Sequence, residues 1–439
     1  MTLPKPDGGL VIRSRRVVTS DGARAASVHI ERGRVSRVGA WSDAPADVID
    51  AGDWVVMPGV VDTHVHVNEP GRSEWEGFET ATRAAAAGGI TTFLDMPLNS
   101  VPATTTVEAL ETKRAAARGK TSVNVEFIGG VVPGNASEIE PLARAGVSAF
   151  KCFLTPSGVD EFPAVNEDDL RTAFPILARI GLPLMVHAED PACIVEGPRG
   201  GSREYSDYLA SRPAEAERSA IRMLVALMRV WPTPVHIVHL SSAESLELIR
   251  DARRRGLPLT VETCPHYLTF AAEEILDGAT ELKCAPPIRG AAERDALWRA
   301  LMDGEIDLVA SDHSPCMPHL KDTNGDFFAA WGGIASLQWS LAAVWTGARS
   351  RGIAPDQLAR WMSSAPAKLA GLSTKGALAP GLDADVTIWD PDASVIVDRA
   401  RLLHRHPVTP YVGRELFGVV RATIVGGRIA FADNSIATE

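Results

Sequence analysis

Residues 60–67 read VVDTHVHV, a short apolar segment that closes on two histidines. Seven further segments of this kind follow, each closing on a polar or turn residue: ITTFLDMP (90–97), VNVEFIGG (123–130), VSAFKCFL (147–154), LPLMVHAED (182–190), VHIVHLSS (235–242), LTVETCPHYL (259–268) and DLVASDHSP (307–315). The stretches between them carry helix formers and end in glycine, as in EGFETATRAAAAGG (76–89) and AESLELIRDARRRG (243–256). Eight alternating strand and helix units predict an α/β fold, a (β/α)8 TIM barrel with its chemistry at the carboxyl ends of the strands.

The two ends of the chain have a different texture. Residues 10–56 read as short alternating segments separated by Gly and Asp, and the same pattern returns in DADVTIWDP (383–391) and VVRATIVGGRIAF (419–431). Alternation of this kind is typical of β-strands joined by turns. The sequence therefore predicts a small β-sandwich domain built from both ends, residues 1–57 and 371–439, and a barrel domain at residues 58–370.

The composition excludes several classes of protein. Hydrophobic residues make up 45% of the 439 residues, and 44 Lys and Arg face 55 Asp and Glu, a net charge of −11 that disfavours nucleic acid as a partner. Five scattered cysteines without a CxxC pair indicate reduced thiols rather than a disulfide framework. No apolar run is long enough to span a bilayer, and residues 1–9 lack the apolar core of a signal peptide. We expect a cytoplasmic protein without a membrane partner.

Residues of the types that bind metals stand at the predicted strand ends. Because side chains alternate along a strand, His64 and His66 point to the same side. Taken alone, such a pair is about as compatible with two structural histidines as with two ligands. His187, His239 and Asp312 also fall at predicted strand ends, however, and this shared position favours a metal site.

Lys151 lies inside the fourth apolar segment, where an unpaired ammonium would be costly. Burial favours the neutral amine, which can add CO2 to form a carbamate with an oxygen for each of two metal ions. The alternatives are a lysine paired with a core carboxylate and a lysine whose amine reaches the rim. The metal-ligand residue types nearby favour the carbamate.

The remaining histidines carry no metal prediction. His236 precedes His239 by three residues, so strand alternation predicts that it points to the opposite side, as a core or helix-facing residue. The structural role is also preferred for His266, His313 and His319, near the predicted rim. The polar segment 322–328 is a surface turn or a loop that closes over the mouth of the barrel.

Several longer motifs resemble the cyclic-amidase branch of the amidohydrolase superfamily, which contains dihydroorotases, hydantoinases or dihydropyrimidinases, and allantoinases. They are PGVVDTHVHVNEPGRSEWEGFETATRAAAAGGITTFLDMP (58–97), KCFL (151–154), VETCPHYL (261–268), APPIR (285–289), SDHSPC (311–316), GALAPGLDADVTIWDP (376–391) and HPVTPYVGRELFG (406–418). The resemblance spans essentially the whole chain.

Departures from the other branches point to allantoinases. Dihydroorotases carry an arginine two residues after the second histidine, where this chain has Asn68. Hydantoinases carry a tyrosine five residues after the bridging lysine, where this chain has Pro156. The resemblance thus implies a hydrolase that opens the hydantoin ring of allantoin to give allantoate. A hydantoinase or dihydropyrimidinase acting on another cyclic amide is the alternative, and a barrel that has lost catalysis is a third reading.

The resemblance also implies roles for single residues. His64 and His66 would bind the more buried of two divalent ions, and His187 and His239 the more exposed one. Zinc is the expected metal, with cobalt, manganese or iron as alternatives. Carboxylated Lys151 would bridge the ions, and Asp312 would complete the site and act as the catalytic base. Substrate contacts are expected at Asn99, Ser157, Cys284 and Ala285. Relatives of this kind are commonly homotetramers.

Overall fold

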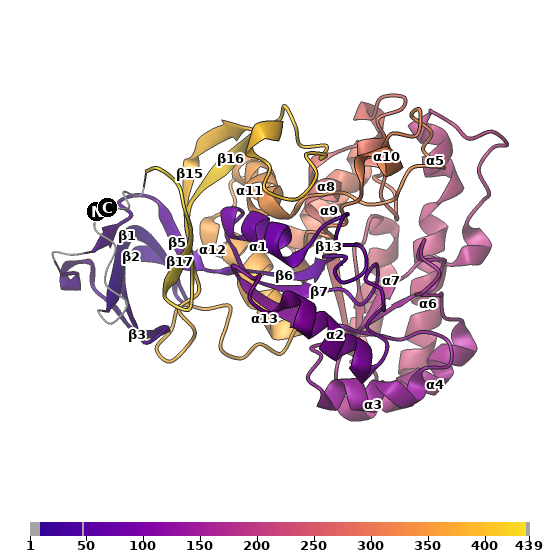
Figure 1. Cartoon of the computed structure of the whole chain (residues 1–439), viewed down its shortest axis with the longest axis horizontal. Coiled ribbons are helices and arrows are strands. Elements are labelled where there is room, and N and C mark those ends of the chain that lie inside the picture. The colour runs from indigo at the N-terminus through magenta and orange to yellow at the C-terminus, as the bar shows by residue number, and fades with distance from the viewer. Residues whose placement is uncertain (1–8, 46–47, 436–439) are drawn as a thin grey trace.

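A computed structural model describes residues 9–45 and 48–435 of the chain. Residues 1–8 and 436–439, which belong to the predicted terminal domain, lie outside the described residues. The expectation that residues 1–9 lack a signal peptide therefore falls almost entirely outside them. Figure 1 shows two parts: strands enclosed by helices, and a sheet in which indigo strands from the N-terminal end and yellow strands from the C-terminal end lie together. Among the described residues, no helix is both long and apolar enough to cross a bilayer.

The eight predicted apolar segments all form barrel strands. These are β6 (Val60–Val65), β7 (Ile90–Asp95), β8 (Asn124–Phe127) with the short β9 (Gly129–Gly130), β10 (Phe150–Phe153), β11 (Leu184–His187), β12 (Val235–Ile237), β13 (Leu259–Thr263) and β14 (Leu308–Val309). Neighbouring strands pair in parallel, in the order β6-β7-β8 and β9 through β14. The prediction of a (β/α)8 barrel is confirmed.

A seam between the first and last strands closes the ring. Val65 of β6 forms a parallel bridge with His313, just beyond β14. The main-chain N–H of His66 donates to the carbonyl oxygen of His313 at 2.8 Å, and that of Ser311 donates to the Asp62 carboxylate at 3.1 Å. The seam thus brings His64 and His66, at the carboxyl end of β6, beside the segment that follows β14.

Most of the helices cover the outside of the ring, and two short ones lie in the loops at the carboxyl ends of the strands. The helices are α1 (Phe78–Ala87), α2 (Val107–Ala117), α3 (Ala136–Arg144), α4 (Glu167–Ile180), α5 (Tyr205–Ser211), α6 (Ala214–Val230), α7 (Leu246–Arg254), α8 (Pro265–Thr269), α9 (Ala291–Met302), α10 (Pro318–Lys321), α11 (Ser340–Ser350), α12 (Pro355–Ala359) and α13 (Ala365–Leu369). The two in the loops are α5 and α10. The sequence sets the limits of the helices: α4 begins where the Asn166 side chain accepts from the N–H of Asp169, and ends at Gly181, whose φ of 73° is left-handed. Their apolar sides pack on the strands in one continuous core.

The terminal sheet has eight strands from both ends of the chain, in the order β17-β16-β15-β5-β1-β2-β3 with β4 beside β1. They are β1 (Leu10–Thr19), β2 (Gly22–Glu31), β3 (Arg34–Gly39), β4 (Ile49–Asp50), β5 (Val55–Pro58), β15 (Val386–Ile396), β16 (Glu415–Val425) and β17 (Arg428–Ala432). Residues of both ends, among them Ile12 and Ile388, share a second apolar cluster. Only Gly59 separates β5 from β6. We propose that the domain boundary lies at this glycine and near residue 370.

Candidate active site

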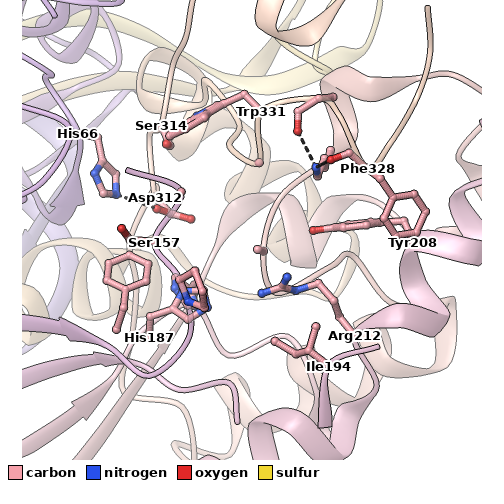
Figure 2. A pocket seen from close by; sticks show the side chains of 18 of the residues that line it. His66, Ser157, His187, Ile194, Tyr208, Arg212, Asp312, Ser314, Phe328 and Trp331 are labelled. Carbon is pink, nitrogen blue, oxygen red and sulfur yellow. Dashed lines mark hydrogen bonds and ion pairs between the residues drawn. The ribbon is translucent and has the colours of Figure 1, made fainter. Parts of the chain in front are cut away.

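Three of the predicted ligands meet at the seam of the barrel. The rings of His64 and His66 lie 5.4 Å apart, so the two histidines do share one side of β6. Nε2 of His64 lies 3.1 Å and Nε2 of His66 3.5 Å from Oδ1 of Asp312. Asp312 reaches this position through a backbone with φ of 45°, in the left-handed region that non-glycine residues rarely adopt. Figure 2 shows Asp312 facing His66 inside the cavity.

The other two predicted histidines lie against the first group. The rings of His187 and His239 are 4.6 Å apart, and the ring of His239 is 5.5 Å from that of His64. Burial, with the nearby Lys151 charge, holds the pKa of His64 well below its ordinary value, and burial likewise lowers the pKa values of His187 and His239. Neutral imidazoles are the form that binds metal ions.

Lys151 lies on β10 within the same group and is fully buried. Its amine forms no ion pair or hydrogen bond with any described residue, and Nζ lies 4.9 Å from the centre of the Phe153 ring. Burial lowers its pKa to about 8, although Asp312 and Glu262 act in the opposite direction. The alternatives of a lysine paired with a core acid or reaching the rim therefore do not describe this residue.

Two buried glutamates that were not predicted from the sequence, Glu262 and Glu189, lie behind the histidines. Nδ1 of His64 lies 2.6 Å from Glu262, and Nε2 of His187 lies 2.7 Å from Glu189. Glu189 also accepts two hydrogen bonds from Arg212, and although burial opposes the change, this guanidinium and His187 lower its pKa to about 2. Such carboxylates fix the tautomer and orientation of a histidine whose other nitrogen is a ligand. In the sequence, the one feature that could have pointed to them is that they lie in the strand-end segments VETCP and HAED.

His236 does not point away from the site as strand alternation predicted. Its Nε2 lies 2.9 Å from the Glu262 carboxylate that also contacts His64, so it faces the interior of the barrel. Alternation fails here because β12 ends at Ile237 and the backbone of His239 is left-handed, with φ of 43°. The expectation that His236 is a core residue holds, since its side chain is fully buried.

A cavity of about 380 Å³ opens above these residues. Asn99, Ser157 and Ala285, three of the residues expected to contact substrate, line it, and Oδ1 of Asn99 is buried without a hydrogen-bond partner among the described residues. Cys284 is not part of the lining: it is buried, and its carbonyl oxygen accepts from the Tyr208 hydroxyl at 2.8 Å. The polar segment 322–328 contributes Phe328 to the lining.

Apart from Phe328, in the polar segment 322–328, the opposite side of the cavity was not predicted. We call Tyr208, Arg212, Lys283, Phe328 and Trp331 the far wall, and His64, His66, His187, His239 and Asp312 the ligand end. Figure 2 shows His66 and Asp312 on one side of the cavity and Tyr208 and Phe328 on the other.

Comparisons with known proteins agree with this geometry. The profile of the amidohydrolase family matches residues 55–430. The chain is 51% identical to an allantoinase of Streptomyces avermitilis over 97% of this chain and 96% of the relative, and 45% identical to an allantoinase of Arabidopsis thaliana over 98% and 89%. Its structure superposes on the L-hydantoinase (dihydropyrimidinase) from Arthrobacter aurescens with a TM-score of 0.90 at 32% identity, covering 98% of this chain and 97% of the other.

The chain belongs to the amidohydrolase family. Within this family it is an enzyme of the cyclic amidohydrolase type, which sets aside the reading of a barrel that has lost catalysis.

The residues of this amidohydrolase fit a metal centre. His64, His66 and Asp312 offer ligand atoms within 4.8 Å of one another, and the separations of 3.1 and 3.5 Å to Asp312 fit atoms that surround one ion. Ligand atoms about 2.1 Å from a tetrahedral ion stand about 3.4 Å apart. The amine of Lys151 is buried and has no hydrogen-bond partner in the described part of the chain. Such a group needs modification or a nearby acceptor, so Lys151 also fits a metal centre.

Proposed function

We propose that this amidohydrolase hydrolyses the hydantoin ring of allantoin and releases allantoate. The observation that carries the proposal is the convergence of four imidazoles, a buried lysine and Asp312 at one end of a cavity, in a chain 51% identical to an allantoinase. Asn68 and Pro156 stand where the arginine of dihydroorotases and the tyrosine of hydantoinases would be expected.

The same residues would hold two divalent ions. His64 and His66 would bind one, His187 and His239 the other, with Lys151 carboxylated by CO2 between them and Asp312 completing the set. Mixed nitrogen and oxygen donors suit Zn2+, with Co2+, Mn2+ or Fe2+ as alternatives. When bound, such ions polarise a carbonyl group and lower the pKa of water toward neutrality.

The side chains of the protein would divide the remaining work. Asp312, at the seam, accepts the proton of the attacking water and passes it to the ring nitrogen that leaves as the amide bond breaks. Glu262 and Glu189 keep His64 and His187 in one orientation. Asn99, Ser157 and the main chain at Ala285 hold the ring amide at the ligand end.

A hydantoinase or dihydropyrimidinase is the second candidate, and the TM-score of 0.90 with the L-hydantoinase (dihydropyrimidinase) favours it. Turnover of allantoin, hydantoin, dihydrouracil and dihydroorotate by the purified protein, with its metals quantified, separates the two. We expect allantoin to be hydrolysed with the highest kcat/KM and about two metal ions per chain. Faster hydrolysis of dihydrouracil than of allantoin would reverse the assignment.

We also propose that the enzyme is a homotetramer acting in the cytoplasm. The five cysteines are free, which fits a reducing compartment. Light scattering on the metal-loaded protein measures the oligomeric state, and a monomer or dimer at assay concentration contradicts the tetramer.

A further inference from the structure

Two buried lysines, Lys283 and Lys321, lie in the loops around the mouth of the cavity, outside the proposed metal ligands. Nζ of Lys283 donates to the carbonyl oxygens of Phe328 at 3.2 Å and Ala330 at 2.5 Å. Nζ of Lys321 donates to three main-chain carbonyl oxygens at 2.8–3.1 Å. In the part of the chain that the structure describes, neither amine forms an ion pair with a carboxylate. Both lysines thus hold the same loops through carbonyl groups.

The two lysines differ in what they can still bind. Three carbonyl oxygens occupy the three N–H groups of the Lys321 ammonium, and Lys321 does not line the cavity. Two carbonyl oxygens occupy two N–H groups of Lys283, which leaves a third. Lys283 lines the cavity, with Nζ 5.2 Å from the centre of the Tyr208 ring. Of the pair, only Lys283 is therefore able to donate to a bound molecule.

The charges around Lys283 favour an electron-rich ligand. Burial, followed by the charges of Lys321 and Arg212, lowers the pKa of Lys283 to about 8, although the Asp326 carboxylate acts in the opposite direction. Arg212 also lines the cavity, and its Nε and Nη2 donate to Glu189 at 3.0 and 2.6 Å. That carboxylate is buried and shared with His187. The far wall therefore presents two cationic side chains, Lys283 and Arg212, to the cavity. Among the described residues, no acceptor is hydrogen-bonded to the third N–H of Lys283.

Allantoin supplies such an acceptor. It consists of a hydantoin ring with a ureido substituent, and when the ring amide occupies the ligand end the substituent extends into the rest of the cavity. We propose that Lys283 donates its remaining N–H to the ureido carbonyl oxygen, and thereby selects rings that carry this substituent. The assignment deepens the proposed function and rests on it.

The experiment compares Lys283→Met with the matched control Lys321→Met, using metal-loaded protein. Methionine keeps the length of the side chain and removes every N–H donor. The KM for allantoin should rise about 10- to 100-fold in Lys283→Met, the range expected for a lost hydrogen bond from a charged donor. The inhibition constant of hydantoin, which has the same ring without the ureido group, should stay within about twofold of the parent. Lys321→Met should leave the ratio of these two constants as in the parent.

A second variant, Lys283→Gln, keeps N–H donors for the loop carbonyls without the charge, and should show a smaller effect of the same kind. Circular dichroism and metal content verify that each variant is folded. Equal loss of affinity for allantoin and hydantoin, or the same pattern in Lys283→Met and Lys321→Met, would show that Lys283 only holds the loop and would overturn the proposal. A parent enzyme that opens hydantoin but not allantoin contradicts the proposed function itself, before any variant is made.

Discussion

At the ligand end of the cavity every proposed donor lies on a barrel strand or within three residues of its end, whereas the far wall comes from α5 and from connecting segments. The strands at the ligand end are held by parallel ladders and by the seam through His313. The far wall is held by side chains that reach main-chain carbonyl groups, as Lys283 and Lys321 do.

This difference separates two tasks. Donors fixed by strand ladders keep positions that suit ion binding and bond breaking, which tolerate little displacement. A wall made of loops can change its side chains without disturbing the barrel, and this suits the choice of substrate. Substitutions at the ligand end should therefore lower turnover of every substrate, and substitutions on the far wall should change the preference among substrates.

The largest effect is expected from Lys151→Ala. Loss of the proposed bridging group should lower kcat for allantoin by roughly four orders of magnitude, as removal of central catalytic groups does. Acetate or propionate at millimolar concentration should restore part of the rate by filling the space with a carboxylate. The same salts should not accelerate the parent enzyme. Undiminished turnover by the unsupplemented variant would contradict the bridge.

Asp312→Asn is expected to have the next largest effect. The variant should keep most of its metal, because the other donors remain, but kcat should fall about 10²- to 10⁴-fold with the loss of the base. The measurement pairs metal analysis with steady-state kinetics. A rate near that of the parent, with metal retained, would remove the assignment of the base.

Replacement of the carboxylates behind the histidines should have a smaller effect on activity than Asp312→Asn. Glu262→Gln and Glu189→Gln should each lower metal affinity or kcat about 10- to 100-fold, the usual range for a group that orients a ligand. Competition with a chelator measures the affinity. Glu262→Gln should affect allantoin and hydantoin alike, whereas Glu189 also accepts from Arg212 of the far wall. An effect of Glu262→Gln confined to allantoin would break the comparison.

The smallest effect is expected in the terminal sheet. Ile388 is fully buried in β15, and Ile388→Val should lower the free energy of unfolding by about 0.5–1.5 kcal/mol through the methylene it removes. Neither kcat nor KM for allantoin should change. Denaturant unfolding and steady-state kinetics provide the two measurements, and a changed KM would mean that the sheet acts on the cavity.

The residues at the ligand end could be predicted from the sequence because the patterns that mark them are local and periodic. Strand alternation brought His64 and His66 to one side, and the ends of apolar segments located His187 and Asp312. Strand alternation failed to predict the direction of His236, which contacts Glu262 inside the barrel. The left-handed backbone of His239 follows shortly after the strand, and no residue propensity in the sequence indicates that conformation.

The far wall and the supporting carboxylates depend on contacts between distant segments. Tyr208 meets Cys284 across 76 residues, and Glu262 meets His64 across 198. Composition and periodicity carry no information about such pairs. The role of Lys283 could not be predicted for the same reason, because it depends on which loop carbonyl groups surround its amine.

The seam also bears on when during synthesis the proposed metal centre can form. Asp62 and Ser311 are 249 residues apart along the chain, and their contact forms only after nearly the whole barrel has left the ribosome. Until then His64 and His66 have no Asp312 opposite them. If cations bind only to the closed ring, they shift the equilibrium from partly folded chains toward the closed ring. Metal supply should therefore increase the yield of mature enzyme as well as its rate.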